Sequence, residues 1–138
     1  MTLIESLTAN SISLDSLEWS MTLKQARVRF PVDIDKINCI KAYSCVFTLE
    51  NTIDSIKINN KQGFVIIADT GIAVLCPLIN DFPITSYIPK KDIRVVESEV
   101  KLFKSIIRIR TNTEVYVFKC NKEDIKEIEK NINKIRST

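Results

Sequence analysis

Residues 105–136 read SIIRIRTNTEVYVFKCNKEDIKEIEKNINKIR, and two hydrophobic periods follow one another within them. Ser105–Thr111 and Glu114–Cys120 show the residue alternation and the β-branched and aromatic content that are typical of strands. The polar pair Asn112-Thr113 between them predicts a hairpin turn. This part of the chain is therefore expected to form two paired strands of an antiparallel sheet.

From Asn121 onward the period changes to that of a helix. Asn121 is a suitable N-cap, acidic side chains occupy the first turn, and basic side chains occupy the last, as the helix dipole favours. These features predict a helix over residues 122–136 whose single apolar stripe covers a core built by the preceding strands. The stripe consists of Ile125, Ile128, Ile132 and Ile135.

Residues 39–98 predict further short strands separated by turn residues. Cys39–Asn51 is rich in aromatic and β-branched side chains. Asn51–Gln62 is polar and predicts a long hairpin loop that contains a short strand at Ile56–Ile58. Asp69-Thr70-Gly71 joins two apolar runs and predicts a tight hairpin connection. The other predicted strands are Gly63–Ala68, Ile72–Leu78, Thr85–Pro89 and Ile93–Ser98.

The N-terminal third predicts helices. Thr2 and Glu5 have the spacing of a capping box, and Ser13 is a candidate cap for a second helix, which Pro31 ends. The side chains that fall near one face of this second helix, with Trp19 off it, are Leu14, Leu17, Met21 and Val28. The chain is accordingly divided into a helical N-terminal extension, residues 1–36, and a β-rich domain, residues 37–138.

The order of these segments and the sequence of residues 63–136 resemble those of the bacterial pleckstrin-homology-like (PH-like) domain family. Members show a Gly-apolar run, a hairpin turn, a second apolar run and an I-P-x-x-x-I-x-x-V segment. The chain departs from this pattern at Gly71, because members often carry an arginine at this position, just after the hairpin turn. The corresponding residues here are Gly63–Ala68 (GFVIIA), Asp69-Thr70-Gly71, Ile72–Leu75 (IAVL) and Ile88–Val96 (IPKKDIRVV).

The resemblance covers roughly half of the chain and implies an α+β, mainly β fold. That fold is a partly open seven-stranded barrel, capped by a C-terminal amphipathic helix and preceded here by the helical extension. The resemblance implies no catalytic activity, and fold alone does not settle function. We therefore expect a non-catalytic interaction or assembly module that binds a protein partner or a second copy of itself.

The composition points away from catalysis and cofactors. Histidine is absent, and the four cysteines form no C-x-x-C pair, so neither a histidine-activated nucleophile nor a zinc site is predicted. Two glycines eight residues apart cannot build a phosphate-binding loop. The sequence shows neither a signal peptide nor an unbroken apolar stretch of membrane-spanning length, so we expect a cytoplasmic protein.

One enzymatic interpretation rests on Asp69-Thr70-Gly71. Retroviral-type aspartic proteases carry such a triplet because two chains each supply an aspartate, and the two carboxyl groups share one proton. Such an enzyme also needs a glycine-bearing flap, and no glycine follows Gly71. A dimeric protease that uses Asp69 therefore ranks third among the candidate functions, and Asp69 is expected in a surface turn.

The net charge of +3 arises at the C-terminal end of the chain. Residues 101–138 hold ten basic and five acidic side chains. If Ser105–Thr111 is a strand, its period of two places Arg108 and Arg110 on one face together with Ile106. Two neighbouring arginines can bind phosphate or carboxylate groups through paired hydrogen bonds.

Lys101 and Lys104 directly precede that strand and extend the basic stretch. Together with Arg108 and Arg110 they form the candidate ligand-binding residues for an anionic membrane surface or an acidic ligand, which is the alternative function. The competing interpretation is a solvated face that keeps a sheet edge soluble. Nucleic acid is not a predicted partner, because no basic patch is interleaved with stacking aromatic side chains.

Overall fold

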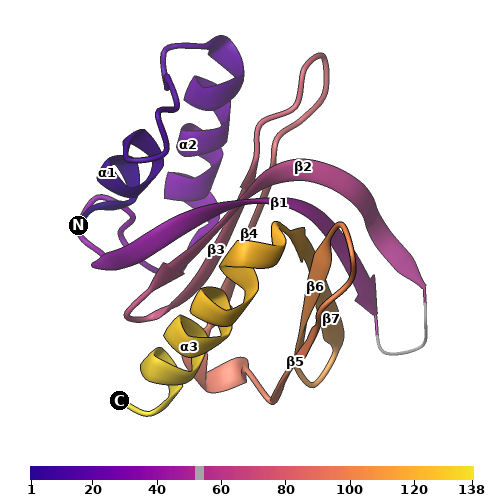
Figure 1. The fold of residues 1–138 in the computed structure, drawn as a ribbon. Helices are drawn as coiled ribbons and strands as arrows, with labels where there is room; N and C mark the ends of the chain where they lie inside the picture. Colours follow the sequence, from indigo (N-terminus) through magenta and orange to yellow (C-terminus); the bar gives the residue numbers. More distant parts are fainter. Residues whose placement is uncertain (52–54) are drawn as a thin grey trace.

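The computed structural model describes residues 1–51 and 55–138, which form one antiparallel sheet and three helices (Figure 1). The strands are β1 (Cys39–Asn51), β2 (Ile56–Ala68), β3 (Gly71–Cys76), β4 (Ile84–Pro89), β5 (Val95–Glu99), β6 (Ser105–Arg110) and β7 (Glu114–Cys120). Their order in the sheet is β4-β3-β2-β1-β7-β6-β5, so β4 and β5 are free edges and the sheet is not closed. The predicted fold class is confirmed: mainly β, open, with a C-terminal helix and a helical N-terminal part.

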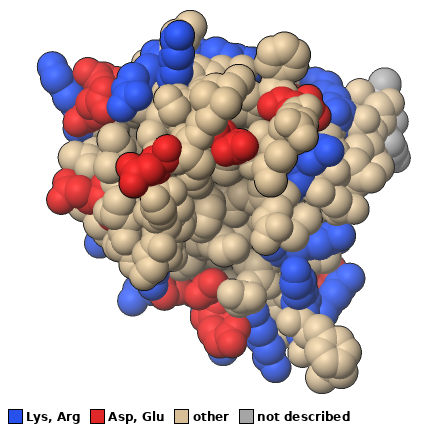
Figure 2. Space-filling model, turned by 90° about the horizontal axis from the view of Figure 1, so that it is seen from above, with Lys and Arg blue, Asp and Glu red and all other residues tan. Residues whose placement is uncertain are grey.

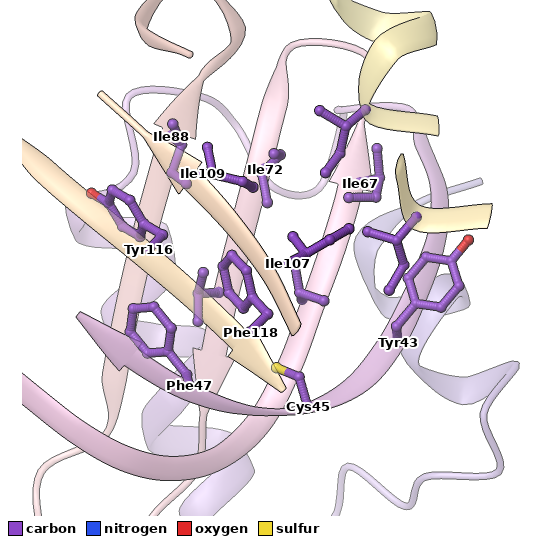
Figure 3. Close-up of a cluster of buried hydrophobic side chains, with 14 of the residues drawn as sticks. Tyr43, Cys45, Phe47, Ile67, Ile72, Ile88, Ile107, Ile109, Tyr116 and Phe118 are labelled. Atoms are coloured by element: carbon purple, nitrogen blue, oxygen red, sulfur yellow. The ribbon is translucent and has the colours of Figure 1, made fainter. Parts of the chain in front are cut away.

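The inner face of the sheet carries the larger core, because alternate side chains of each strand point to the same face. Figure 3 shows Phe47 of β1 and Phe118 of β7 side by side, and their ring centroids are 5.3 Å apart with an angle of 21° between the planes. Ile67, Ile72 and Ile107 come from three other strands and are fully buried in the same cluster. The two halves of the sheet therefore share one core.

Helix α3 (Ile125–Arg136) lies against this inner face and follows a 3₁₀ turn at Lys122–Asp124. The predicted isoleucine stripe is confirmed, since all four side chains are buried. Asn131 Nδ2 donates to the Tyr43 hydroxyl of β1 at 2.9 Å, and Ser98 Oγ of β5 donates to a Glu129 carboxylate oxygen at 2.6 Å. Because β1 lies in the middle of the sheet and β5 at its edge, α3 links the two halves of the open sheet.

Helices α1 (Leu3–Thr8) and α2 (Leu17–Arg29) cover the outer face of the sheet over β1–β4, on the side opposite to α3 (Figure 1). The Trp19 ring lies 5.9 Å from that of Phe64 in β2, and the Phe30 ring lies 5.4 Å from that of Tyr87 in β4. β3 is consequently buried on both faces, which explains its unbroken apolar sequence. The predicted capping box at the start of α1 is confirmed.

Three local predictions were wrong. Asn121 precedes the 3₁₀ turn at Lys122–Asp124, but its side chain makes no capping hydrogen bond, and the α-helix itself begins at Ile125. α2 is capped by Ser16, whose hydroxyl oxygen accepts the Trp19 N–H at 3.2 Å, so the helix begins later than a Ser13 cap would allow. Residues 56–62, predicted to be mostly loop, belong to β2 and pair with β1. Asn60 has a φ of 50°, and its N–H donates to Thr48 Oγ1 at 3.1 Å, which marks a bulge that lets this polar segment stay in the sheet. Residues 52–54 of the predicted loop lie outside the described residues.

Candidate functional site

Arg108 and Arg110 lie on the outer face of β6, as the alternation predicts, while Ile107 and Ile109 point into the core. The neighbouring strand β5 presents two carboxylates on the same face. Arg108 Nη1 lies 3.2 Å from Glu99 Oε2, and Arg110 Nε lies 3.2 Å from Glu97 Oε1. The register of β5 against β6 thus brings each arginine to a carboxylate within the domain.

These ion pairs make the two arginines less available to an anionic ligand. Each pair is partly exposed and contributes only about 0–1 kcal/mol to stability, but an incoming anion would have to compete with the carboxylate for the guanidinium. Lys101 and Lys104 lie in the loop between β5 and β6, and Lys101 Nζ is 4.0 Å from Glu99 Oε1, on the carboxylate that also pairs with Arg108. The four predicted residues are therefore two strand arginines in close ion pairs and two loop lysines, of which Lys101 is at the limit of ion-pair distance.

Asp69 lies in the exposed turn between β2 and β3, as predicted. Its N–H donates to the Asn38 carbonyl oxygen at 2.9 Å, and the neighbouring Thr70 hydroxyl is hydrogen-bonded to the Tyr87 hydroxyl. These bonds tie the turn to β4 and to the start of β1. In this chain the Asp69-Thr70-Gly71 triplet forms the anchored turn between β2 and β3. A catalytic Asp69 would require a second chain to supply the partner carboxylate.

A polar groove of ≈ 350 Å³ lies between the end of β4 and the β6–β7 hairpin. The Glu114 carboxylate in its wall accepts a hydrogen bond from Lys57 Nζ at 2.9 Å and another from the Tyr116 hydroxyl at 3.2 Å. Asp92 adds a further carboxylate to the lining. The groove is therefore polar and acidic, which is the wrong charge for an anionic ligand.

Helix α2 has a second apolar face, which points away from the sheet. Leu17 and Val28 are 71% and 79% exposed, Met21 is 41% exposed, and their spacing places them on one face of the helix. Phe82 in the β3–β4 loop is 79% exposed, and with Met21 it lines two shallow grooves of ≈ 370 and ≈ 440 Å³. We call Leu17, Met21, Val28 and Phe82 the α2 surface.

Within the described residues, large apolar side chains are also exposed together in the loop between β5 and β6. Val100, Leu102 and Phe103 are 55%, 80% and 87% exposed, and we call these three residues the apolar tip. Lys101 and Lys104 alternate with them along the chain. The two loop lysines of the predicted basic site are thus part of a mixed apolar and cationic loop.

Neither of these exposed apolar surfaces is identifiable from hydrophobic periodicity alone. The sequence predicts that Leu17, Met21 and Val28 share one face of the helix, but α2 is apolar on two sides, and only the packing shows that the Trp19 side faces the sheet. Within residues 101–110 the four basic side chains form the more obvious pattern, and Leu102 and Phe103 lie between two of them. The signal for the loop was their position, since two large apolar residues between strands break the usual polarity of a hairpin connection.

All four cysteine thiols are free and buried. Burial raises the pKa of Cys39 from its ordinary value to about 11, and it raises the pKa values of Cys76 and Cys120 to about 12. Burial also raises the pKa of Cys45. The thiolate is the nucleophilic form of cysteine, so these shifts favour inert core thiols over reactive ones.

The shifted thiol pKa values predict a loss of stability at alkaline pH. As pH rises above the ordinary thiol value of 9.0, the unfolded chain releases these protons before the folded chain does. The free energy of unfolding should then fall, by up to about 1.4 kcal/mol per pH unit for each thiol, until the folded pKa is reached. Urea denaturation at pH 8 to pH 11 measures this slope. Cys120→Ala should make the slope shallower, and an unchanged slope would contradict the assignment.

Comparison of the sequence with models of protein families and with curated proteins finds no match. Within residues 1–51 and 55–138, no three or more His, Cys, Asp or Glu side chains are placed to hold a metal ion. Among the same residues, no helix has both the length and the apolar character needed to span a bilayer.

Proposed function

We propose that the chain is a non-catalytic PH-like assembly module that pairs with a second copy of itself through the α2 surface. The open seven-stranded sheet with a helix against its inner face supports the PH-like assignment. The self-pairing rests on the α2 surface, where an exposed apolar helix face adjoins an exposed aromatic ring. Contiguous apolar patches of this kind on a folded domain are typical of interaction sites.

Charges of opposite sign flank the two grooves of the α2 surface. Glu18 and Asp81 line the groove at the N-terminal end of α2, and Lys24 and Arg29 line the groove towards its C-terminal end. Among the residues that the structure describes, none of these four side chains forms an ion pair. Their charges are therefore available to a second molecule.

An antiparallel pairing of two α2 helices brings the acidic end of each helix next to the basic end of the other. A two-fold axis near the middle of α2 brings Glu18 of one copy close to Arg29 of the other, and it sets Leu17 against Val28. The same arrangement places the two helix dipoles antiparallel, which is favourable. Because one surface supplies both the acidic and the basic partner, it is complementary to itself. This self-complementarity favours a second copy over an unrelated protein.

The variant Met21→Glu with Val28→Glu should remain monomeric. For the unchanged protein, sedimentation equilibrium should give a molar mass that rises with concentration towards twice the 15.8 kDa of one chain. The variant should stay at the mass of one chain, because pairing would bury carboxylates without partners. Val28 is 79% exposed and Met21 is 41% exposed in one chain, and neither belongs to a core cluster, so the melting temperature of the variant should change little.

A charge exchange tests the proposed geometry of the pair. Glu18→Arg and Arg29→Glu should each weaken pairing about tenfold or more, because like charges then face one another across the axis. The two changes combined should restore pairing. Lys36→Glu, an exposed charge reversal away from the α2 surface, serves as the control and should have no effect. A protein that is monomeric at every concentration, or a combined variant no tighter than the single ones, would refute the self-pairing.

A further inference from the structure

The apolar tip is held in place by the strands on both sides of it. The Lys101 N–H donates to Ser105 Oγ at 3.4 Å, and Ser105 itself is completely buried at the start of β6. β5 and β6 pair along their length up to the residues next to the loop, with Glu99 opposite Ile106. The loop therefore projects Leu102 and Phe103 from a fixed base, and neither side chain is covered by the rest of the chain.

Positive charge surrounds this apolar tip. Lys101 and Lys104 alternate with its residues, and Lys104 lines a small surface hollow together with Lys119 of β7. Figure 2 shows Lys and Arg side chains gathered at the lower right around an uncharged projection of the surface. Glu99 lies close to Lys101, but its carboxylate also pairs with Arg108. The environment of the tip is thus apolar at the end and cationic around it.

We infer that the apolar tip inserts into the headgroup region of a lipid bilayer that carries anionic lipids, while Lys101 and Lys104 bind the headgroups. Large apolar side chains with basic neighbours are the combination that holds peripheral proteins at an anionic interface. Lysine suits this position, because its aliphatic stem can lie along the apolar layer while its ammonium group stays among the headgroups. This inference does not depend on the self-pairing, because the tip and the α2 surface share no residue.

The shape of the loop favours a bilayer over a protein partner. Leu102 and Phe103 stand next to one another on a convex projection, and protein recognition of such a knob needs a preformed pocket in the partner. A bilayer interface deforms around the knob and needs no pocket. Arg108 and Arg110 have little part in this contact, because Glu99 and Glu97 already engage their guanidinium groups.

The test is co-sedimentation of the full chain with phosphatidylcholine vesicles that contain or lack phosphatidylserine. The protein should bind the anionic vesicles, more weakly at high salt, and should bind the neutral vesicles poorly. Leu102→Ser with Phe103→Ser should weaken binding at least about tenfold, because two exposed side chains lose their burial in the bilayer. Lys101→Gln and Lys104→Gln should each weaken it about fivefold. Ile56→Ser, an exposed apolar residue outside the tip, is the matched control and should bind normally.

Depth of insertion gives a second readout that charge alone would not produce. In a Phe103→Trp variant, brominated lipids should quench the new tryptophan emission, whereas the buried Trp19 gives a constant background. The inference fails if the protein ignores anionic vesicles at low salt, if the tip variant binds as well as the parent, or if quenching is absent. It also fails if Ile56→Ser lowers binding as much as the tip variant, since that indicates unspecific adsorption. Should the tip variant instead lose self-pairing without any vesicle binding, the tip is a protein contact.

Discussion

Ile132→Ala should lower the free energy of unfolding by about 2–5 kcal/mol, the range for removing a large aliphatic side chain from a closed core. Ile132 is completely buried in the third turn of α3, and it belongs to the core cluster that also contains buried side chains of β1, β2, β3, β4, β6 and β7. The loss should be near the upper end of the range. Ile132 lies between α3 and the sheet, so the cavity left by the smaller side chain can be filled only if the helix moves towards the strands. Urea denaturation measures the change directly.

A surface position on the same helix provides the control for this prediction. Lys126 is exposed in α3, and Lys126→Ala should alter the free energy of unfolding by no more than about 0.5 kcal/mol. If Ile132→Ala unfolds at the same urea concentration as the parent, α3 does not hold the sheet together. A fall in the slope of the transition without a shift of its midpoint would point instead to a change in the denatured state.

The strongest periodic signals in the sequence predicted the parts of the fold that they describe. The isoleucine stripe of α3 faces one core, so its period maps directly onto burial. Residue alternation likewise predicted β6 and β7, although Ile106, Val115 and Val117 on their other face are also buried, in a small separate cluster. The hairpin at Asp69 and Thr70 was equally clear, because turn residues separate two apolar runs. These elements can be predicted from their own residues, with little information about the rest of the chain.

Elements that touch two environments were harder to predict. β3 is buried on both faces because α2 covers its outer side, so its sequence shows no period at all. α2 itself places Trp19 and Leu23 against the sheet while Leu17 and Val28 remain exposed. Which of two apolar faces a helix buries depends on a packing partner distant in sequence, and that partner cannot be read from the helix.

The candidate basic site shows the same limit for charges. Alternation correctly placed Arg108 and Arg110 on one outer face of β6. Their pairing with Glu99 and Glu97 depends on which strand lies next to β6 and in which register, and a shift of one residue would turn the carboxylates to the opposite face. Local charge excess is therefore an upper bound on the charge that a folded strand presents to a ligand.

Gly71→Ala should lower the free energy of unfolding by about 3 kcal/mol, because glycine here permits a close approach between two strands. Gly71 pairs with Pro89 across β3 and β4, and a Cβ built on Gly71 would lie 2.2 Å from the Ile88 carbonyl oxygen. That oxygen belongs to the backbone, so the overlap can be relieved only by moving β4. Neither glycine of the chain has a positive φ, so the turn itself does not require glycine at this position.

The two explanations for Gly71 predict different results for asparagine. If the residue were needed for a left-handed backbone, Gly71→Asn would be milder than Gly71→Ala, because asparagine adopts that conformation more readily. If close approach is the reason, both variants carry the same Cβ, and asparagine should destabilise at least as much as alanine. Asp69→Ala in the exposed turn serves as the control and should change stability by no more than about 0.5 kcal/mol. A clearly milder Gly71→Asn would overturn the steric explanation, in which the close approach of β4 leaves no room for a side chain at this position.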